Sequence, residues 1–445
     1  MLKESLKQVS VLGAAGKMGR GISLLLLQEM ARTEAELTGN VGRGIFRLHL
    51  FDSNDEGLIV LKKYLLTQLH RYAKKNINRL REYFSSNSNL ISNEDIIRTF
   101  VQRGLDIVYL DSEIASSKNS TMIFEAVIED IQIKTELFSK LRAIGRKDAY
   151  YFTNTSSIPI HHLSKKSGLE HRLIGYHFYN PPEIQKLIEI IIPAKSNPTL
   201  ESLALELTQR FGKIAVLSND IAGFIGNGHF IREIDYACRK VQELEKKFSR
   251  EQAITMLDNV TREFLLRPMG IFQLIDYVGI DVCQKVMSIM GEFLHLSFSR
   301  ELVDTMINKE KKGGQNPDGS QRDGFFSYQQ RKPAKIFDDK THTYISIPND
   351  SLGPLPSGHI SWKKLNEIND KEEILRNHFS SLFSSSTFGA KIAQSYLWHS
   401  REIARNLIKN GVAKSVEDVN TVLMNGFYHP YGIENAWIPE KTTQK

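Results

Sequence analysis

The sequence is poor in the residues that mark secreted disulfide scaffolds and membrane proteins. It has two cysteines, Cys238 and Cys283, which are too few for a disulfide framework and indicate a reducing compartment. Both lie in apolar, helix-like surroundings, as inert core thiols do. No run of about 18 apolar residues is present, so we expect no membrane-spanning segment. The first predicted strand begins near Gln8, which leaves no room for a signal or transit peptide, and we expect a cytoplasmic protein.

Charge and length restrict the functions that the chain can have. The sequence carries 58 lysines and arginines against 51 aspartates and glutamates, a net charge of +7. The basic residues are spread along the chain and mixed with acids, so we expect no nucleic-acid interface, whereas a polyanionic small ligand remains open. We also expect no metal site. With 445 residues, of which 41% are hydrophobic, the chain is long and apolar enough for two or three domains.

Short apolar segments alternate with helical ones in the N-terminal half. Residues 8–12 (QVSVL) indicate a buried strand, which a glycine-rich turn and the helical segment GISLLLLQEMA follow. Further strands are predicted at residues 46–51, 122–125, 150–153, 173–176, 187–192 and 215–217, and a helix at residues 58–84. This alternation predicts an α/β fold with a Rossmann-type, doubly wound, mostly parallel sheet.

After about Asp220 the pattern becomes helical, so one or more all-α domains should follow the sheet. Helical segments dominate from Phe224 to Asn308, whereas residues 332–368 show no clear period and contain several prolines and glycines. We therefore expect four parts: a Rossmann-type cofactor-binding domain (1–219), a helical domain (220–331), a linker or irregular cap (332–371) and a second, degenerate helical repeat (372–445).

A weak internal similarity supports the last of these parts. Residues 249–271 (SREQAITMLDNVTREFLLRPMGI) resemble residues 415–433 (SVEDVNTVLMNGFYHPYGI). Both begin with Ser-x-Glu, which suits the start of a helix, and both end in Pro-x-Gly-Ile. The match needs a gap, so chance similarity remains an alternative.

The turn after the first strand has the glycine spacing G-x-x-G-x-x-G, at Gly13, Gly16 and Gly19. Glycines at such a turn allow a tight bend, let the backbone approach a pyrophosphate and let the helix pack on the strand. A plain strand–helix turn is the alternative. The residues expected to hold a dinucleotide here are Gly13, Gly16, Lys17, Met18 and Gly19.

Asp52 strengthens the prediction of a dinucleotide site. It ends the second predicted strand, where an acid binds the ribose hydroxyls, and an acid there favours NAD over NADP because it would repel a 2′-phosphate. Its distance from the turn exceeds the usual spacing of roughly 20 residues. The excess falls in residues 33–44 (TEAELTGNVGRG), which we interpret as an inserted loop.

Two titratable residues interrupt the apolar stretch RLIGYHFYNPPEIQKLIEII at residues 172–191. If the chain reverses around Pro181–Glu183, His177 and Glu189 come to lie side by side. A histidine can accept a hydroxyl proton, and a carboxylate on its other ring nitrogen would orient it. From the residues alone, a core histidine and a glutamate paired with some base explain the pattern equally well.

The order and spacing of several further blocks resemble the L-3-hydroxyacyl-CoA dehydrogenases from Val9 to about Tyr328. The blocks are FEAVIEDIQIKTELF at 124–138, NTSSIPI at 154–160, GYHFYNPPEIQKLIEII at 175–191, DIAGFIGN at 220–227 and RPMGIFQLIDYVGID at 267–281. The resemblance implies that His177 is the catalytic base and Glu189 its partner. It also implies that Ser156 and Asn227 contact the substrate oxygen.

The same resemblance implies a cofactor and a substrate. Glu129, Lys134 and Asn154 match residues near the NAD, and Lys75 matches a lysine that holds the CoA phosphates. For Lys75, a solvated helix face is almost as good an explanation. The implied reaction is NAD-dependent oxidation of (S)-3-hydroxyacyl-CoA to 3-oxoacyl-CoA, in fatty-acid β-oxidation or short-chain acyl-CoA metabolism. A dehydrogenase of a free 3-hydroxy acid and a non-catalytic NAD-binding scaffold are the alternatives.

The chain departs from the family pattern at three places. The glycine turn is a longer variant, the segment before Asp52 is enlarged, and Gly228 stands where an arginine usually follows the asparagine of the DIAGFIGN block. The chain also extends past the usual end. It therefore resembles the dehydrogenase part of multifunctional β-oxidation enzymes, in which a second helical repeat replaces the partner subunit. A homodimer and such an internal pseudo-dimer are both open.

Overall fold

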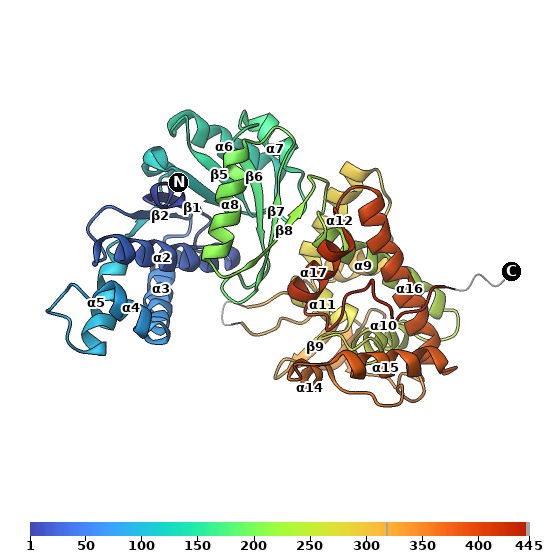
Figure 1. Cartoon of the computed structure of the whole chain (residues 1–445). Helices are drawn as coiled ribbons and strands as arrows, with labels where there is room; N and C mark the ends of the chain where they lie inside the picture. Colours follow the sequence, from blue (N-terminus) through green and yellow to red (C-terminus); the bar gives the residue numbers. More distant parts are fainter. Residues whose placement is uncertain (317–318, 442–445) are drawn as a thin grey trace. The chain divides into compact units, whose positions relative to one another are not determined.

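A computed structural model describes residues 1–316 and 319–441 of the chain. The chain forms two compact units, Met1–Asp220 (unit 1) and Ile221–Lys445 (unit 2) (Figure 1). No helix in the described part of the chain is both long and apolar enough to cross a membrane.

Unit 1 is built on one eight-stranded sheet. Its strands are β1 (Gln8–Leu12), β2 (Arg47–Phe51), β3 (Val108–Asp111), β4 (Met122–Glu125), β5 (Tyr150–Thr153), β6 (Leu173–Phe178), β7 (Leu187–Ile191) and β8 (Ile214–Ser218). Their order is β3-β2-β1-β4-β5-β6-β7-β8, and every pair is parallel except the antiparallel pair β6–β7. This order confirms the doubly wound, mostly parallel sheet.

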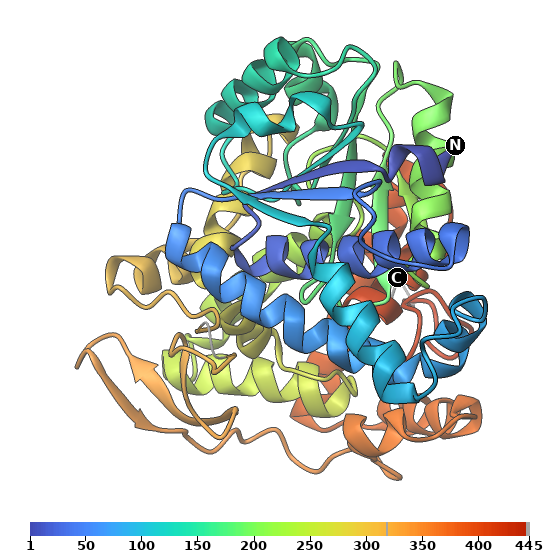
Figure 2. The ribbon, with the colours of Figure 1, turned by 90° about the vertical axis from the view of Figure 1, so that its left-hand side faces the viewer.

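Helices cover both faces of the sheet and bury its central strands. All residues of β4, β6 and β7 are buried, as expected of strands between helical layers. The helices of unit 1 are α1 (Leu2–Ser5), α2 (Lys17–Thr38), α3 (Asp55–Lys75), α4 (Ile77–Tyr83), α5 (Asn93–Leu105), α6 (Ile131–Ile144), α7 (Ile160–Ser167) and α8 (Pro198–Arg210), with a 3₁₀ turn at Ile114–Asn119. Helix α2 packs on β1, and α3 and α5 pack on α2 (Figure 2).

Several details of unit 1 differ from the prediction, among them strand β3, which was not expected. Residues 33–38 continue α2 instead of opening an inserted loop, because Glu34 is fully buried and accepts hydrogen bonds from the amides of Gly42 (2.6 Å) and Arg43 (3.1 Å). The predicted helix 58–84 is divided between α3 and α4 at Asn76, whose side chain donates to the Tyr72 carbonyl (2.9 Å). Asparagine favours such local bonds over helix continuation.

Unit 2 is mainly helical. Its helices are α9 (Gly226–Leu244), α10 (Arg250–Asn259), α11 (Ile271–Val278), α12 (Ile280–Leu294), α13 (Glu301–Asn308), α14 (Trp362–Asn366), α15 (Glu372–Ser384), α16 (Phe388–Lys409) and α17 (Val416–Gly426), and a π-helical turn at Val260–Phe264 follows α10. Helix α16 packs on α9 and on the π-helical turn.

The segment expected to be a linker or irregular cap contains regular structure. Strands β9 (Phe326–Gln329), β10 (Lys332–Asp338) and β11 (Thr343–Ser346) form an antiparallel sheet. Figure 2 shows β10 and β11 as a hairpin. Phe326 of β9 and Ile336 and Phe337 of β10 are buried, whereas the other strand residues are more exposed, so the apolar signal in the sequence is short. The prediction missed these strands for that reason.

The two similar segments of unit 2 share their local geometry. Ser249 and Ser415 are the N-caps of α10 and α17, and each side chain accepts from the amide three residues on. Near the other end, Leu266 and Tyr428 both have a left-handed backbone, with φ of 54° and 57°. Each stands two residues before the proline of Pro-x-Gly-Ile.

Candidate active site

The carboxyl ends of the central strands of unit 1 carry most of the residues that the sequence singles out. In an open parallel sheet this edge forms the ligand crevice where the strand order reverses, here between β1 and β4. The residues at this edge are Gly13 after β1, Asp52 after β2, Glu129 after β4, Asn154 and Ser156 after β5, and His177 near the end of β6.

The glycine turn leaves room for a ligand at the start of α2. Gly13 has a left-handed backbone (φ 73°), and a Cβ there would lie 2.7 Å from the Ala126 carbonyl oxygen. A Cβ on Gly19 would lie 1.9 Å from the Gly13 carbonyl oxygen, so only glycine lets α2 approach the turn so closely. Gly16 caps α2 without a side-chain hydrogen bond. The first backbone amides of α2, at Lys17 and Met18, are therefore suited to bind a phosphate.

Asp52 is tied to this turn. Its Oδ2 accepts from the Ala15 amide at 2.9 Å, and its Oδ1 accepts from the Asn54 amide at 3.1 Å. Each carboxylate oxygen can accept a further hydrogen bond, which is what a ribose hydroxyl would donate. The turn and Asp52 thus fit a dinucleotide.

Glu129 organises the loop after β5. Its Oε1 accepts hydrogen bonds from the hydroxyls of Thr155 (2.6 Å) and Ser157 (2.8 Å) and from the amides of Ser156 (3.1 Å) and Ser157 (3.2 Å). Burial alone would raise the pKa of Glu129, but the Lys134 charge and these hydrogen bonds outweigh it and lower the pKa below its usual value. The carboxylate therefore stays charged and fixes the Ser156 backbone.

Lys134 lies inside the fold. Its ammonium is 2.5 Å from Glu125 Oε1 and 3.5 Å from Glu129 Oε2, and its side chain is 1% exposed. Burial would lower the pKa of Lys134, but the two carboxylates raise it above its usual value. These contacts assign Lys134 to holding Glu129 in place, and direct contact of either residue with NAD stays a prediction.

Asn154 links β5 to the strand that carries the histidine. Its Oδ1 accepts from the amide of Phe178 at 2.8 Å, and its own amide donates to the Glu125 carbonyl at 2.8 Å. The Asn154 side chain thus fixes the end of β6 next to His177. Its predicted contact with the cofactor is untested.

The antiparallel pairing of β6 and β7 brings His177 and Glu189 together. The two residues are direct partners in the strand register, and His177 Nδ1 lies 3.2 Å from Glu189 Oε2. Glu189 is fully buried, and His177 is 8% exposed. The chain reversal inferred from the sequence is therefore present. A buried carboxylate on Nδ1 leaves Nε2 as the nitrogen for a proton from substrate.

Two further predicted site residues lie on helices, and one of them belongs to unit 2. Lys75 is exposed in the last turn of α3. Asn227, in the first turn of α9, and Gly228 belong to unit 2. A Cβ on Gly228 would lie 3.0 Å from the Leu407 side chain of α16, so a larger residue there would require this side chain to move.

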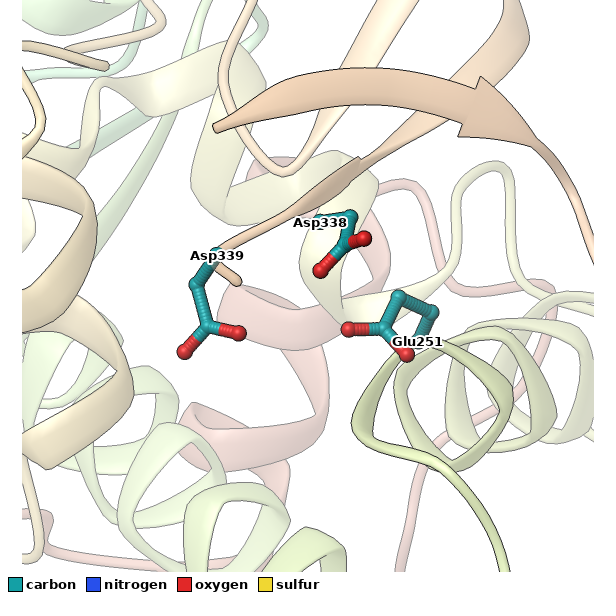
Figure 3. Close-up of side chains that lie close together, drawn as sticks. All are labelled: Glu251, Asp338 and Asp339. Atoms are coloured by element: carbon teal, nitrogen blue, oxygen red, sulfur yellow. The ribbon is translucent and has the colours of Figure 1, made fainter. Parts of the chain in front are cut away.

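One group of acidic residues has the spacing of a cation site. Among residues 1–316 and 319–441, Glu251, Asp338 and Asp339 are the one set of three candidate ligand groups that converge (Figure 3). Asp339 is paired with Arg250 at 2.6 Å. Asp338 accepts from the Lys340 amide (2.9 Å) and the Thr341 hydroxyl (2.8 Å). The protein itself thus satisfies two of the three carboxylates, and the group carries no metal assignment.

A sheet edge that joins a dinucleotide-binding turn to a buried histidine–carboxylate pair is the arrangement of a nicotinamide-dependent dehydrogenase. The chain belongs to the 3-hydroxyacyl-CoA dehydrogenase family. Residues 53–221 match the model of its NAD-binding domain, and residues 223–322 match its C-terminal domain. The first match starts directly after Asp52, so the glycine turn and the long α2 precede it.

Named relatives agree with this family. The chain is 28% identical over 329 residues to a probable 3-hydroxybutyryl-CoA dehydrogenase of Bacillus subtilis, covering 73% of this chain and 99% of the relative. It is 29% identical to the mitochondrial hydroxyacyl-coenzyme A dehydrogenase of Sus scrofa, covering 63% and 78%. A putative fatty acid oxidation complex trifunctional enzyme of Rickettsia prowazekii is 24% identical over 98% of this chain and 54% of its own length.

A solved structure shows the same fold. The 3-hydroxybutyryl-CoA dehydrogenase of Escherichia coli aligns with a TM-score of 0.60 at 18% identity, over 96% of this chain and 90% of that one.

Proposed function

We propose that the chain oxidises (S)-3-hydroxyacyl-CoA to 3-oxoacyl-CoA with NAD, as a step of fatty-acid β-oxidation. The observation that carries this proposal is the His177–Glu189 pair, at 3.2 Å, on the same sheet edge as the glycine turn. Membership of the 3-hydroxyacyl-CoA dehydrogenase family supports the substrate class.

The proton moves to His177. Glu189 accepts from Nδ1–H, which fixes the tautomer in which Nε2 is the base. Nε2 takes the proton of the C3 hydroxyl, and Glu189 stabilises the imidazolium that forms. The NAD nicotinamide, when bound, supplies the acceptor for the C3 hydride. In the reverse direction the imidazolium returns the proton to the oxygen of the reduced ketone.

The remaining residues bind and orient. The amides at the start of α2 and the carboxylate of Asp52 would hold the dinucleotide. Ser156, on the loop that Glu129 fixes, would donate to the C3 oxygen as it becomes a carbonyl, and Asn227 would do the same. Lys75 would contact the CoA phosphates from the exposed end of α3.

We also infer an internal pseudo-dimer rather than a homodimer. Helix α16 packs on α9 beside Gly228, so that face of α9 is covered within the chain. Both cysteines are free and buried, which is consistent with the proposed cytoplasmic location.

The test is NADH oxidation with acetoacetyl-CoA and with free acetoacetate. The wild-type chain should reduce the thioester, and Lys75→Glu should raise KM for it. His177→Gln should lower kcat by about 10²–10⁴-fold with little change in NADH affinity. His171→Gln is the control, because His171 is exposed and contacts the Lys195 carbonyl on the surface of the same unit.

Three results would contradict the proposal in different ways. Wild-type turnover of His177→Gln would remove the histidine from the mechanism. Equal efficiency with free acetoacetate would favour the dehydrogenase of a free hydroxy acid. No NADH oxidation with acetoacetyl-CoA or longer 3-oxoacyl-CoAs would favour the non-catalytic scaffold.

A further inference from the structure

A third side chain contacts the acid–base pair. Tyr179 stands two residues after His177, and its hydroxyl donates to Glu189 Oε2 at 2.7 Å. This is the same oxygen that faces His177 Nδ1 at 3.2 Å. The Tyr179 and His177 rings also touch, with their centroids 4.9 Å apart and their planes at 41°. Tyr179 therefore contacts both members of the pair.

The surroundings make this hydrogen bond strong. Glu189 is fully buried and Tyr179 is 8% exposed, so little solvent competes for the carboxylate. Hydrogen bonds to an ionised group are shorter and about twice as strong as neutral ones. Burial, together with the neighbouring Glu189 charge, raises the pKa of Tyr179 well above its ordinary value. The hydroxyl thus remains protonated, and a donor, at neutral pH.

Groups from three segments face Glu189. Strand β6 contributes His177, the segment after β6 contributes Tyr179, and β8 places the apolar Val216 opposite Glu189 in the register. One carboxylate oxygen is shared between an imidazole and a phenol. A donor to a carboxylate stabilises its charge and weakens its attraction for any other proton nearby.

We propose that Tyr179 is a positioning residue of the reaction, which holds Glu189 against His177 and limits how strongly that carboxylate raises the proton affinity of the imidazole. This inference rests on the proposed function of His177 and Glu189. Two effects follow from it. The hydroxyl fixes the carboxylate rotamer, and it takes up hydrogen-bonding capacity that Glu189 Oε2 would otherwise offer to the imidazole alone.

The test is Tyr179→Phe, which removes one oxygen and keeps the ring. In the oxidation of 3-hydroxybutyryl-CoA, His177 must be neutral, so its pKa sets the acidic limb of the rate profile. The acidic limb of kcat should move up by about 0.5–1 pH unit, and kcat at its plateau should fall by about 3–30-fold, a fraction of the effect of a whole general base. KM for NAD and for the thioester should change by less than about twofold, because Tyr179 acts through Glu189.

Two further variants separate positioning from plain stability. Tyr176→Phe is the matched control, since Tyr176 lies on β6 next to His177 but bonds Thr208 of α8 at 2.7 Å; it should leave the pH profile in place. In a Glu189→Gln background, Tyr179→Phe should add less than about a twofold loss, because residues of one network are not additive.

Specific results would overturn the inference. An unchanged acidic limb with kcat within twofold of wild type would show that the hydroxyl has no role. An equal loss in the wild-type and Glu189→Gln backgrounds would show a structural effect only, as would a shifted profile in Tyr176→Phe. If instead His177→Gln keeps full activity, the proposed function fails, and that outcome is independent of Tyr179.

Discussion

Replacing Arg267 with methionine should strongly destabilise unit 2, because it leaves a buried carboxylate without its partner. Arg267 stands in the Arg-Pro-Met-Gly segment after the π-helical turn and pairs with Glu233 of α9 through two bonds of 2.8 Å. The two side chains are 5% and 4% exposed. Ser400 of α16 donates to the same carboxylate at 2.6 Å, so the pair also connects α16 to α9.

The expected size follows from this burial. Burial would raise the pKa of Glu233, but the facing guanidinium more than offsets this and holds the pKa well below its usual range. Breaking a buried pair by removing one partner costs about 3–5 kcal/mol. For a unit of the size of residues 221–445, each kcal/mol lowers Tm by roughly 2–4 °C, so a loss of roughly 6–20 °C is expected.

The assay is a thermal and denaturant melt of the full chain, in a cycle of Arg267→Met, Glu233→Gln and the double variant. Arg239→Met is the matched control on α9, the helix that carries Glu233, because Arg239 pairs with Asp235 at 3.0 Å but its side chain is 60% exposed. A pair with such an exposed arginine should contribute less than about 1 kcal/mol. The double variant should be more stable than the sum of the single losses predicts.

A small loss of stability on replacing the buried Arg267 would contradict this expectation. If Arg267→Met costs no more than Arg239→Met, burial of the pair does not determine its contribution. If the cycle shows no coupling between positions 267 and 233, the 2.8 Å contacts are not the source of the loss.

Two further predictions concern pH and assembly. Burial lowers the pKa of His229 and of His429, so the unfolded chain takes up these protons near pH 6.5 while the folded chain does not. The contribution of these histidines to the free energy of unfolding should be complete above pH 6.5 and fall below it, by up to about 1.4 kcal/mol per histidine at pH 5.5. In thermal melts, His429→Gln should therefore lose less stability than the wild type between pH 7.5 and 5.5. Equal slopes for the two proteins would contradict this. Light scattering at micromolar concentration should give the mass of one chain, and a dimer mass would contradict the inferred pseudo-dimer.

Much of the sheet could be predicted because its central strands are mostly or fully buried. A mostly apolar run such as LIEII at 187–191, which only Glu189 interrupts, is stable between two layers. Strand β3 (Val108–Asp111) was missed for the opposite reason, since none of its four residues is buried. The extension of α2 was missed because Glu34 looks like a surface residue, and only the fold shows that it binds the Gly42 and Arg43 amides.

The residues of the candidate site could likewise be predicted only in part. His177 and Glu189 could be paired from their spacing, because a reversal midway between them sets an antiparallel register. Tyr179 could also have been found, since it follows His177 by two residues, the spacing that places side chains on one side of an extended chain. The interior position of Lys134 could not be predicted from the sequence. Its partner Glu125 lies at the end of β4, and only the packing of α6 on the sheet brings the two side chains together.

The register of β6 and β7 restricts which insertions and deletions this chain could tolerate. His177 meets Glu189 because seven residues connect Tyr179 to Leu187, and the side chains of a strand alternate between its two faces. One residue added to or removed from that connection, with the rest of the sheet in place, would turn Glu189 to the opposite face and bring an isoleucine to the imidazole. Length changes that are harmless in other surface turns should therefore abolish activity here, even in a protein that still folds.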